Sequence, residues 1–191
     1  RRARHDARPG TGVKIQGVVI EMSSNSKNAL RTVIMGAGNI LMKDDGIGVH
    51  VVQAMQNNQG LPGGVELIDA GTAALDTFNL LDGIDRLIII DAIKGGGMPG
   101  TIYKLTPDDI REKPRNTISL HQMSLLQALA SNLLLGSAPS DITIIGVEPK
   151  EISMGTELSE EVAGRVKAIV EIAIEIAHDT CRKGRDNTNE V

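Results

Sequence analysis

The sequence contains few aromatic residues and a single cysteine. The first excludes a core rich in aromatic side chains, and the second excludes a disulfide within the chain. Aromatic residues make up 1% of the chain, with one Phe, one Tyr and no Trp, so a core must be built from aliphatic side chains. Because Cys181 is the only cysteine, an internal disulfide is impossible. The sequence also lacks a secretory hydrophobic segment. Together these absences predict a protein of the reducing cytoplasm.

Long apolar runs and excess positive charge are missing as well. No apolar run approaches the roughly 20 residues that a membrane-spanning helix needs. The net charge is −4, from 20 Lys and Arg against 24 Asp and Glu. General nucleic-acid binding depends on a concentrated positive surface, so neither a membrane nor a nucleic acid is expected as a partner. With 191 residues, 41% of them hydrophobic, the chain is long enough for one domain with a buried core.

Both ends are expected to be extensions of a single domain at residues 31–178. Residues 1–30 carry four arginines near their start and then the polar stretch SSNSKN, which predicts a flexible basic and polar extension. The arginine pair is not followed by the apolar segment of a twin-arginine export signal. Whether GVVIEM at residues 17–22 adds an edge strand stays open. Residues 179–191, DTCRKGRDNTNEV, are predicted to be a frayed polar tail.

Between these ends, short apolar runs alternate with helical patterns. Strands are predicted at residues 32–36, 65–70, 86–92, 99–105 and 141–149, and helices at residues 46–57, 73–81, 120–135 and 158–177. The strand at 99–105 follows its predecessor after the short connection GGGMP, which leaves no room for a parallel crossover, so it is predicted to be antiparallel. The fold class is α/β: a three-layer α/β/α sandwich with a five-stranded, mostly parallel mixed sheet.

Four acids follow or end the first three predicted strands. Asp44 and Asp45 come after the first strand, Asp69 ends the second, and Asp91 ends the strongly apolar third. In open α/β sheets the ligand crevice lies beyond the carboxyl ends of the strands. Carboxylates gathered there need a proton, a cation or water to relieve their repulsion.

His121, in SLHQMSLL, is a further candidate. Ser119 and Gln122 have the spacing of a capping box, which predicts His121 in the first turn of a helix. The positive helix end favours the neutral imidazole, the form that binds metals. If His121 meets two carboxylates, the three ligands leave open positions, as a hydrolytic metal site needs. The sequence alone does not bring His121 and Asp91 together.

Structural roles are alternatives for each of these residues. One of Asp44 and Asp45 has the position of an N-cap for the helix that begins near residue 46. Asp69 and Asp91 occupy positions where a carboxylate accepts backbone N–H groups from a turn. A lone histidine such as His121 is more often structural than a ligand. His50 has no argument for it beyond its proximity to the acids.

A nucleotide-binding loop is excluded by spacing. In GAGNILMKDDGIGVH, Gly36 and Gly38 fit the first two positions of GxGxxG, but Leu41 occupies the third. The acid expected about 20 residues beyond such a loop is also missing. The lysine-bearing phosphate loop is absent too.

Five segments, in this order, resemble the hydrogenase maturation proteases: residues 36–50, DAGTA at 69–73, IIIDAI at 88–93, SLHQMSLL at 119–126 and IGVEP at 145–149. The resemblance covers about residues 32–177. It implies a twisted five-stranded mixed sheet between helices. It also implies an aspartic-type endopeptidase that removes a short C-terminal extension from the large-subunit precursor of a nickel–iron hydrogenase, after the nickel has been inserted.

The same resemblance assigns the site. The family's three metal-contacting residues, which are also the catalytic candidates, correspond to Asp45, Asp91 and His121. Many relatives carry glutamate where this chain has Asp45. DAGT differs by one small residue from the DGGT of relatives, a loop that borders the substrate. The implied substrate contacts are Asn39, Asp69, Gly71 and Thr72. The glycines after the first strand are then expected to let the backbone turn tightly and bring Asp45 to the sheet edge.

Nickel is expected to arrive with the precursor, although other divalent ions suit the same ligands. The protein is expected to act as a monomer. One alternative function is a non-proteolytic checkpoint or chaperone that tests nickel loading on the same precursor. Another is a metal-dependent hydrolase of the aminopeptidase kind, which would need more ligands than this sequence supplies for two metals.

Overall fold

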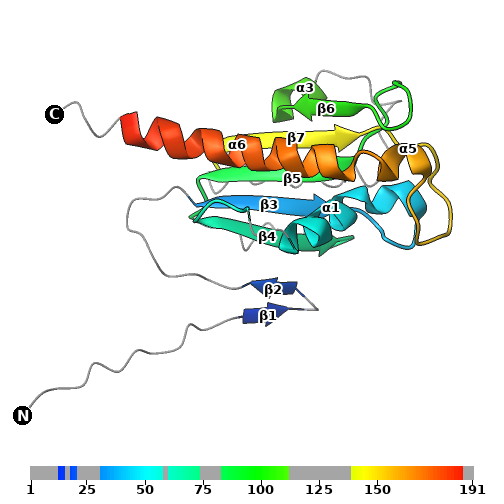
Figure 1. Ribbon diagram of the computed structural model, residues 1–191, viewed down its shortest axis with the longest axis horizontal. Helices are drawn as coiled ribbons and strands as arrows, with labels where there is room; N and C mark the ends of the chain where they lie inside the picture. The colour runs from blue at the N-terminus through cyan, green and yellow to red at the C-terminus, as the bar shows by residue number, and fades with distance from the viewer. Residues whose placement is uncertain are drawn as a thin grey trace, which may run out of the picture.

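The computed structural model describes residues 13–15, 18–20, 31–57, 60–73, 83–111 and 139–186. Its body is a five-stranded sheet with the order β4-β3-β5-β7-β6 (Figure 1). The strands are β3 (Thr32–Ala37), β4 (Val65–Gly71), β5 (Arg86–Ala92), β6 (Ile102–Leu105) and β7 (Asp141–Val147). All neighbouring pairs are parallel except β6 and β7, which are antiparallel. The predicted mostly parallel mixed sheet is therefore confirmed, including its one antiparallel strand.

Helices α1 (Ile47–Gln56) and α6 (Val166–Asp186) lie across one face of this sheet (Figure 1). Ile88 and Ile90 of β5 pack on that side, whereas Leu87 and Ile89 belong to the cluster on the other side, and all four are fully buried. Burial on both faces explains why the strand is a continuous apolar run. The helix predicted for 120–135 lies outside the described residues, as does all but the first residue of the one predicted for 73–81.

The C-terminal helical region differs from the prediction at two points. It is divided into α5 (Glu160–Ala163) and α6, with Gly164 as the C-cap of α5, where the sequence predicted one helix over 158–177. In addition, α6 continues to Asp186, into the stretch predicted to be a frayed tail. No proline follows residue 177 to stop it, and adding a residue to an existing helix costs far less than starting one.

Two short strands precede the main sheet. β1 (Val13–Ile15) and β2 (Val18–Ile20) pair with each other as a separate antiparallel sheet. GVVIEM therefore contributes a strand to this hairpin and does not extend the five-stranded sheet. A 3-10 helix, η1 (Lys43–Gly46), follows β3, and α3 (Pro107–Arg111) follows β6. Among the described helices, none combines the length and apolar character needed to cross a bilayer.

The order of the strands creates a switch point between β3 and β5. The connection after β3 leads to β4 on one side, whereas the connection after β5 leads to β6 and β7 on the other, so the two connections leave in opposite directions across the sheet. Such a reversal separates the connections at the carboxyl ends of the two strands and opens a crevice there. The turn η1 follows β3 at this edge, and Asp91 is the next-to-last residue of β5.

Candidate active site at the switch point

Glycines hold the turn after β3 tightly against the sheet. A Cβ atom added to Gly48 would lie 2.1 Å from the carbonyl oxygen of Ile90 and 2.4 Å from that of Ala37, so the start of α1 packs directly on two strands. Gly38 has φ +121°, and a Cβ atom there would lie 1.8 Å from the carbonyl oxygen of Asp45. Only glycine fits such contacts. The glycines therefore serve the tight turn that brings Asp45 to the sheet edge.

Asp44 is the structural member of the acid pair. It is fully buried. Its Oδ2 atom accepts the backbone N–H groups of Lys150 and Glu151, both at 2.9 Å. Ser159 donates its N–H to Oδ1 at 2.7 Å and its hydroxyl to Oδ2 at 2.9 Å. Asp44 thus fastens η1 to the loop at residues 149–159, and a metal would have to displace these four donors to reach it.

The proposed N-cap role is wrong for both acids. The N-cap of α1 is Gly46, and no side-chain hydrogen bond caps that helix. Asp45 is 8% exposed, and its Oδ2 atom accepts the N–H of Asn39 at 2.9 Å. Consecutive residues in this tight turn point in different directions, so Asp44 turns to the 149–159 loop and Asp45 turns back over the end of β3.

Asp91 lies near Asp45 at the end of β5. It is 7% exposed, and its Oδ1 atom accepts the N–H of Ala92 at 2.8 Å. Burial raises the pKa of Asp91 most, and the negative charge of Asp45 raises it further, from 3.8 to about 7. The hydrogen bond from the Ala92 N–H lowers this pKa in part. A carboxyl group with this pKa exchanges its proton near neutral pH, which suits a general acid or base.

Asp69 does not join this pair, although the sequence predicted a cluster of four acids. Gly36 of β3 is in register with Asp69 on one side and with Ile90 on the other. Asp69 therefore points to the same face as Ile90, whereas Asp91, the next residue after Ile90, points to the opposite face. In agreement, Gln53 of α1 donates a hydrogen bond to Asp69 at 3.4 Å.

The DAGT loop lies beside the turn that carries Asn39. Gly38 donates its N–H to the carbonyl oxygen of Gly71 at 2.9 Å. Asp69 accepts the N–H of Gly71 at 3.1 Å, as its structural alternative predicted. Gly71 has φ +49° and Thr72 is exposed. The predicted substrate contacts thus occupy two adjoining turns.

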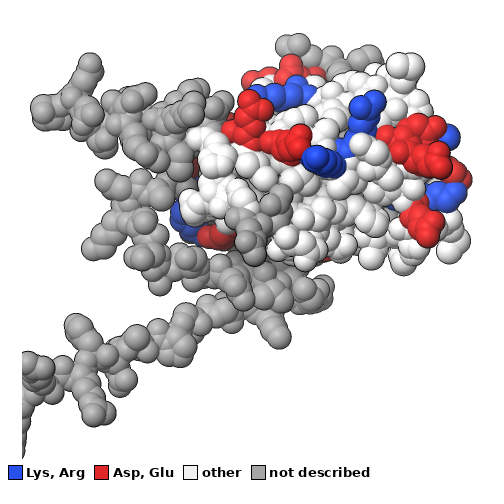
Figure 2. Space-filling model, viewed as in Figure 1, with Lys and Arg blue, Asp and Glu red and all other residues white. Residues whose placement is uncertain are grey.

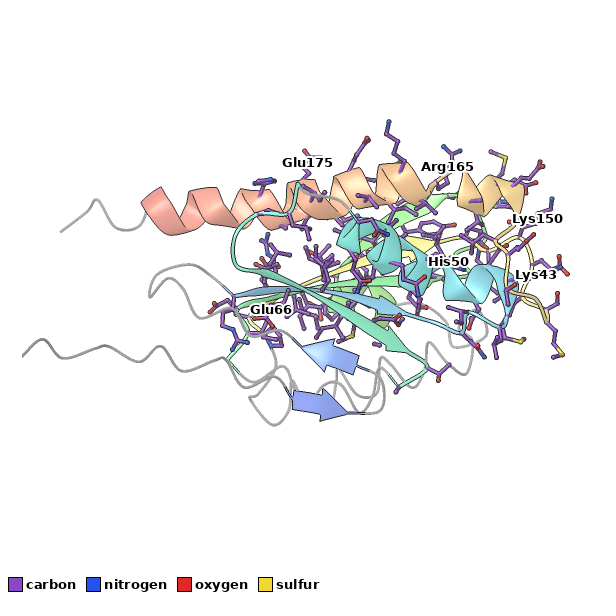
Figure 3. All side chains as sticks on the ribbon, turned by 60° about the horizontal axis from the view of Figure 1, so that its bottom comes forward. Lys43, His50, Glu66, Lys150, Arg165 and Glu175 are labelled. Atoms are coloured by element: carbon purple, nitrogen blue, oxygen red, sulfur yellow. The ribbon has the colours of Figure 1, made fainter. Side chains whose placement is uncertain are left out.

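His121, the third predicted ligand, lies outside the described residues. Within the stretches that are described, no three His, Cys, Asp or Glu side chains are arranged to hold a metal. His50 is half-buried on α1 (Figure 3). Its Nε2 atom has no hydrogen-bond partner among the residues that the structure describes. Asp45 and Asp91 are therefore the described members of the predicted ligand set.

Glu148 is a buried carboxylate for which the sequence predicts no role. Its Oε2 atom accepts the N–H of Gly95 at 2.7 Å, the N–H of Gly97 at 3.2 Å and the hydroxyl of Tyr103 at 2.6 Å. These bonds fix the glycine-rich connection between β5 and β6, just beyond Asp91. The position of Glu148 at the end of an apolar strand, in IGVEP, could have indicated a role for it. Its hydrogen-bond partners could not be predicted, because they come from a distant part of the chain.

The chain matches known proteins over most of its length. The sequence model of the family described as HycI, hydrogenase maturation protease, matches residues 49–176, a range that contains Asp91 and His121 and begins just after Asp45. The hydrogenase expression/formation protein HupD of Rhodobacter capsulatus is 36% identical over 146 residues, which are 75% of this chain and 70% of that protein. The hydrogenase 2 maturation protease of Escherichia coli K12 is 34% identical over 147 residues, 76% of this chain and 87% of that protein.

Solved structures show the same relationship. The hydrogenase maturating endopeptidase HybD from E. coli superimposes with a TM-score of 0.71 at 31% identity, over 79% of this chain and 94% of that one. The [NiFe] hydrogenase maturation protease HybD from Thermococcus kodakarensis gives a TM-score of 0.65 at 33% identity, over 78% of this chain and 99% of that one. Family match, sequence identity and fold agree, and this chain belongs to the hydrogenase maturation proteases, a family of peptide hydrolases.

Proposed function

We propose that this protein removes a C-terminal extension from the large-subunit precursor of a nickel–iron hydrogenase once nickel has been inserted. One observation carries the proposal: two buried carboxylates, Asp45 and Asp91, interact at the switch point of the sheet, the place where open α/β sheets bind their ligands. The names of the E. coli relatives, a hydrogenase 2 maturation protease and a hydrogenase maturating endopeptidase, support a hydrogenase as the target.

The nickel belongs to the substrate in this proposal, because it arrives bound to the precursor. Asp45 and Asp91 supply oxygen ligands, and His121 is proposed to supply an imidazole, which suits nickel. The raised pKa of Asp91 supports this assignment, because a divalent cation would relieve the repulsion that the proton now relieves. Three protein ligands leave positions open for groups of the precursor. The enzyme alone is therefore expected to bind nickel weakly, and tight stoichiometric binding in a calorimetric titration without precursor would contradict this point.

The protein's own residues suggest how the peptide bond is attacked. In the competing scheme, in which the nickel is only recognised, Asp91 is our candidate for the general base that activates water, because its pKa lies near neutral pH. Asp45 stays fixed by the N–H of Asn39. Asp69 is a weaker candidate for the base, because it lies on the opposite face of the sheet and is hydrogen-bonded there.

The nickel then has one of two roles: Lewis acid at the scissile carbonyl, or mark of a correctly loaded precursor. A precursor that carries an inert divalent ion of similar size separates the two. Cleavage at an unchanged rate means that the ion is only recognised. Loss of cleavage with unchanged binding means that its chemistry is needed.

Intact-mass spectrometry of a candidate large-subunit precursor tests the function itself. After incubation with this protein, the nickel-loaded precursor is expected to lose the mass of its C-terminal extension, whereas the nickel-free precursor keeps its mass. Binding of the loaded precursor without any mass loss would favour the non-proteolytic checkpoint. We expect the reaction to occur in the cytoplasm, with the enzyme as a monomer.

A further inference from the structure

Large apolar side chains are exposed at only a few positions of the described chain. They are Ile40 at 43%, Leu41 at 58%, Met98 at 80% and Met154 at 86% exposure. Ile40 and Leu41 lie in the turn after β3, Met154 in the loop after β7, and Met98 in the connection between β5 and β6. All four therefore lie in segments that follow the carboxyl ends of parallel strands, the edge that holds Asp45 and Asp91.

Backbone pairing joins the two segments that carry three of these side chains. Gly155 donates its N–H to the carbonyl oxygen of Leu41 at 3.0 Å, and Lys43 donates its N–H to the carbonyl oxygen of Gly155 at 2.9 Å. Met154 therefore lies beside Ile40 and Leu41. We name these three residues, Ile40, Leu41 and Met154, the rim patch. Met98 is not held to it by any of these bonds.

Hydrogen bonds hold the backbone of the rim patch and connect it to the candidate site. Leu41 donates its N–H to the side-chain oxygen of Asn39 at 2.9 Å, and Asn39 donates its own N–H to Asp45 at 2.9 Å. On the other side, the buried Asp44 carboxylate binds the two ends of the loop that carries Met154. A backbone held in this way loses little conformational entropy when a partner binds, so the cost of ordering falls on the three side chains.

Two ion pairs lie next to the rim patch. Lys43 and Glu151 form an ion pair at 2.7 Å, and so do Lys150 and Glu161. Lys43 and Lys150 lie at the same end of the molecule (Figure 3), and Figure 2 shows basic and acidic residues side by side at that end. A partner would meet these two lysines already paired beside an apolar surface, so apolar contact is the source of affinity that the rim patch itself offers.

The size of the rim patch indicates the kind of partner. A stable interface between two proteins buries about 1,200–2,000 Å² in total, which three side chains cannot supply alone. A second copy of this chain held only by this surface would bind too weakly to form a dimer. The patch instead suits a short segment of a partner that is also held at a second point nearby. Asp45, the proposed ligand of the precursor's nickel, is that second point.

We propose that the rim patch binds an apolar segment of the hydrogenase precursor. This contact aligns the scissile peptide bond of the precursor with the site formed by Asp45 and Asp91. This inference rests on the proposed function, because it takes the precursor as the molecule that both surfaces hold. Affinity for the precursor then comes partly from the patch, whereas the chemical step depends on the acids. Changes in the patch alter KM and leave kcat unchanged.

Steady-state cleavage of the nickel-loaded precursor by Leu41→Ser and Met154→Ser variants tests the proposal. Each substitution is expected to raise KM about tenfold, the loss expected when one buried apolar side chain is removed from an interface. Met98→Ser is the matched control, since Met98 is similarly exposed but lies outside the patch, and it is expected to keep the wild-type KM. Met154→Leu, which restores an apolar side chain, is expected to recover most of the affinity.

The outcomes separate this proposal from the proposed function. If the wild-type protein cleaves the precursor and the patch variants keep its KM, the docking surface is refuted and the function stands. If the wild-type protein does not cleave the precursor, the proposed function is refuted. The docking surface is then tested by the dissociation constants for the immobilised precursor: tenfold weaker binding by the patch variants supports the docking surface, and equal binding refutes it. Wild-type dimers in sedimentation velocity that the variants lose would mean that a second copy occupies the patch, which also overturns the proposal.

Discussion

Asp45 and Asp91 interact across the switch point of the sheet, and the charge of Asp45 contributes to the raised pKa of Asp91. The two neighbouring acids that the sequence grouped with them have other partners. Asp44 is enclosed by backbone N–H groups of the 149–159 loop, and Asp69 binds Gln53 on the opposite face. The described part of the candidate site therefore contains one pair of acids, and the segments around the pair hold it in place.

The stability of the protein is predicted to fall as the pH rises from about 4 to about 7. The pKa of Asp91 is raised from 3.8 to about 7, so in this interval the folded state keeps a proton that the unfolded chain has released. The stabilisation is complete below the unfolded pKa and is lost as the pH passes the folded pKa. Because Asp91 is almost fully buried, the change is on the order of a few kcal/mol.

Urea unfolding at several pH values measures this change. The Asp91→Asn variant is expected to lack the decline, because its side chain stays neutral at every pH. Asp45→Asn is expected to show a smaller decline, since the nearby negative charge is gone. Parallel pH profiles for the wild-type protein and Asp91→Asn would show that Asp91 does not hold its proton.

Removing the Asp44 carboxylate is predicted to destabilise the fold. Asp44→Ala leaves three partly buried backbone N–H groups of the 149–159 loop without their acceptor, with an expected loss of about 3 kcal/mol. The control is Glu157→Ala, an exposed acid in the same loop, with an expected change within about 0.5 kcal/mol. Chemical unfolding of both variants gives the comparison. Equal stability of the two would mean that Asp44 does not fasten this loop.

Gly48 is predicted to tolerate no side chain. In Gly48→Ala the new methyl group would meet the carbonyl oxygens of Ile90 and Ala37, so α1 must move away from the sheet at a cost of about 2 kcal/mol. Gly63→Ala is the matched control, because a Cβ atom there meets nothing within 4 Å. Thermal unfolding should separate the two variants by several degrees. A Gly48→Ala protein as stable as Gly63→Ala would refute the close packing of α1 on β3 and β5.

Most of the fold could be predicted because its strands are short, strongly apolar runs between turn residues. The candidate site was harder to predict from the sequence, for two physical reasons. In a sheet buried on both faces, a strand such as β5 shows no alternation of polar and apolar residues, so the sequence does not say to which face Asp91 points. The different roles of Asp44 and Asp45 depend on the 149–159 loop, which lies more than a hundred residues further along the chain.

Tyr103 offers a direct measurement of the Glu148 cluster. Burial and the hydrogen bond to Glu148 raise the pKa of Tyr103 above 10.0. It is the only tyrosine, and the chain has no tryptophan, so ultraviolet absorbance reports on this residue alone. The folded protein is expected to ionise at higher pH than the urea-unfolded chain, and Glu148→Gln is expected to reduce the difference. Identical titration curves for folded and unfolded protein would contradict the cluster.

The central claim is that Asp45, Asp91 and His121 act on the nickel-loaded precursor as one site. Intact-mass measurement of that precursor over time, with the wild-type protein and with Asp45→Asn, Asp91→Asn and His121→Ala, tests it most directly. We expect the wild-type protein to release the C-terminal extension and each variant to lose at least about a hundredfold in rate, the contribution typical of one positioned acid–base group. No variant should melt markedly below the wild-type protein at neutral pH, and Asp91→Asn should melt higher, because its neutral side chain avoids the cost of a buried charge. Wild-type rates from Asp91→Asn or His121→Ala would contradict the claim, and a large loss of melting temperature in His121→Ala would assign that histidine to the core.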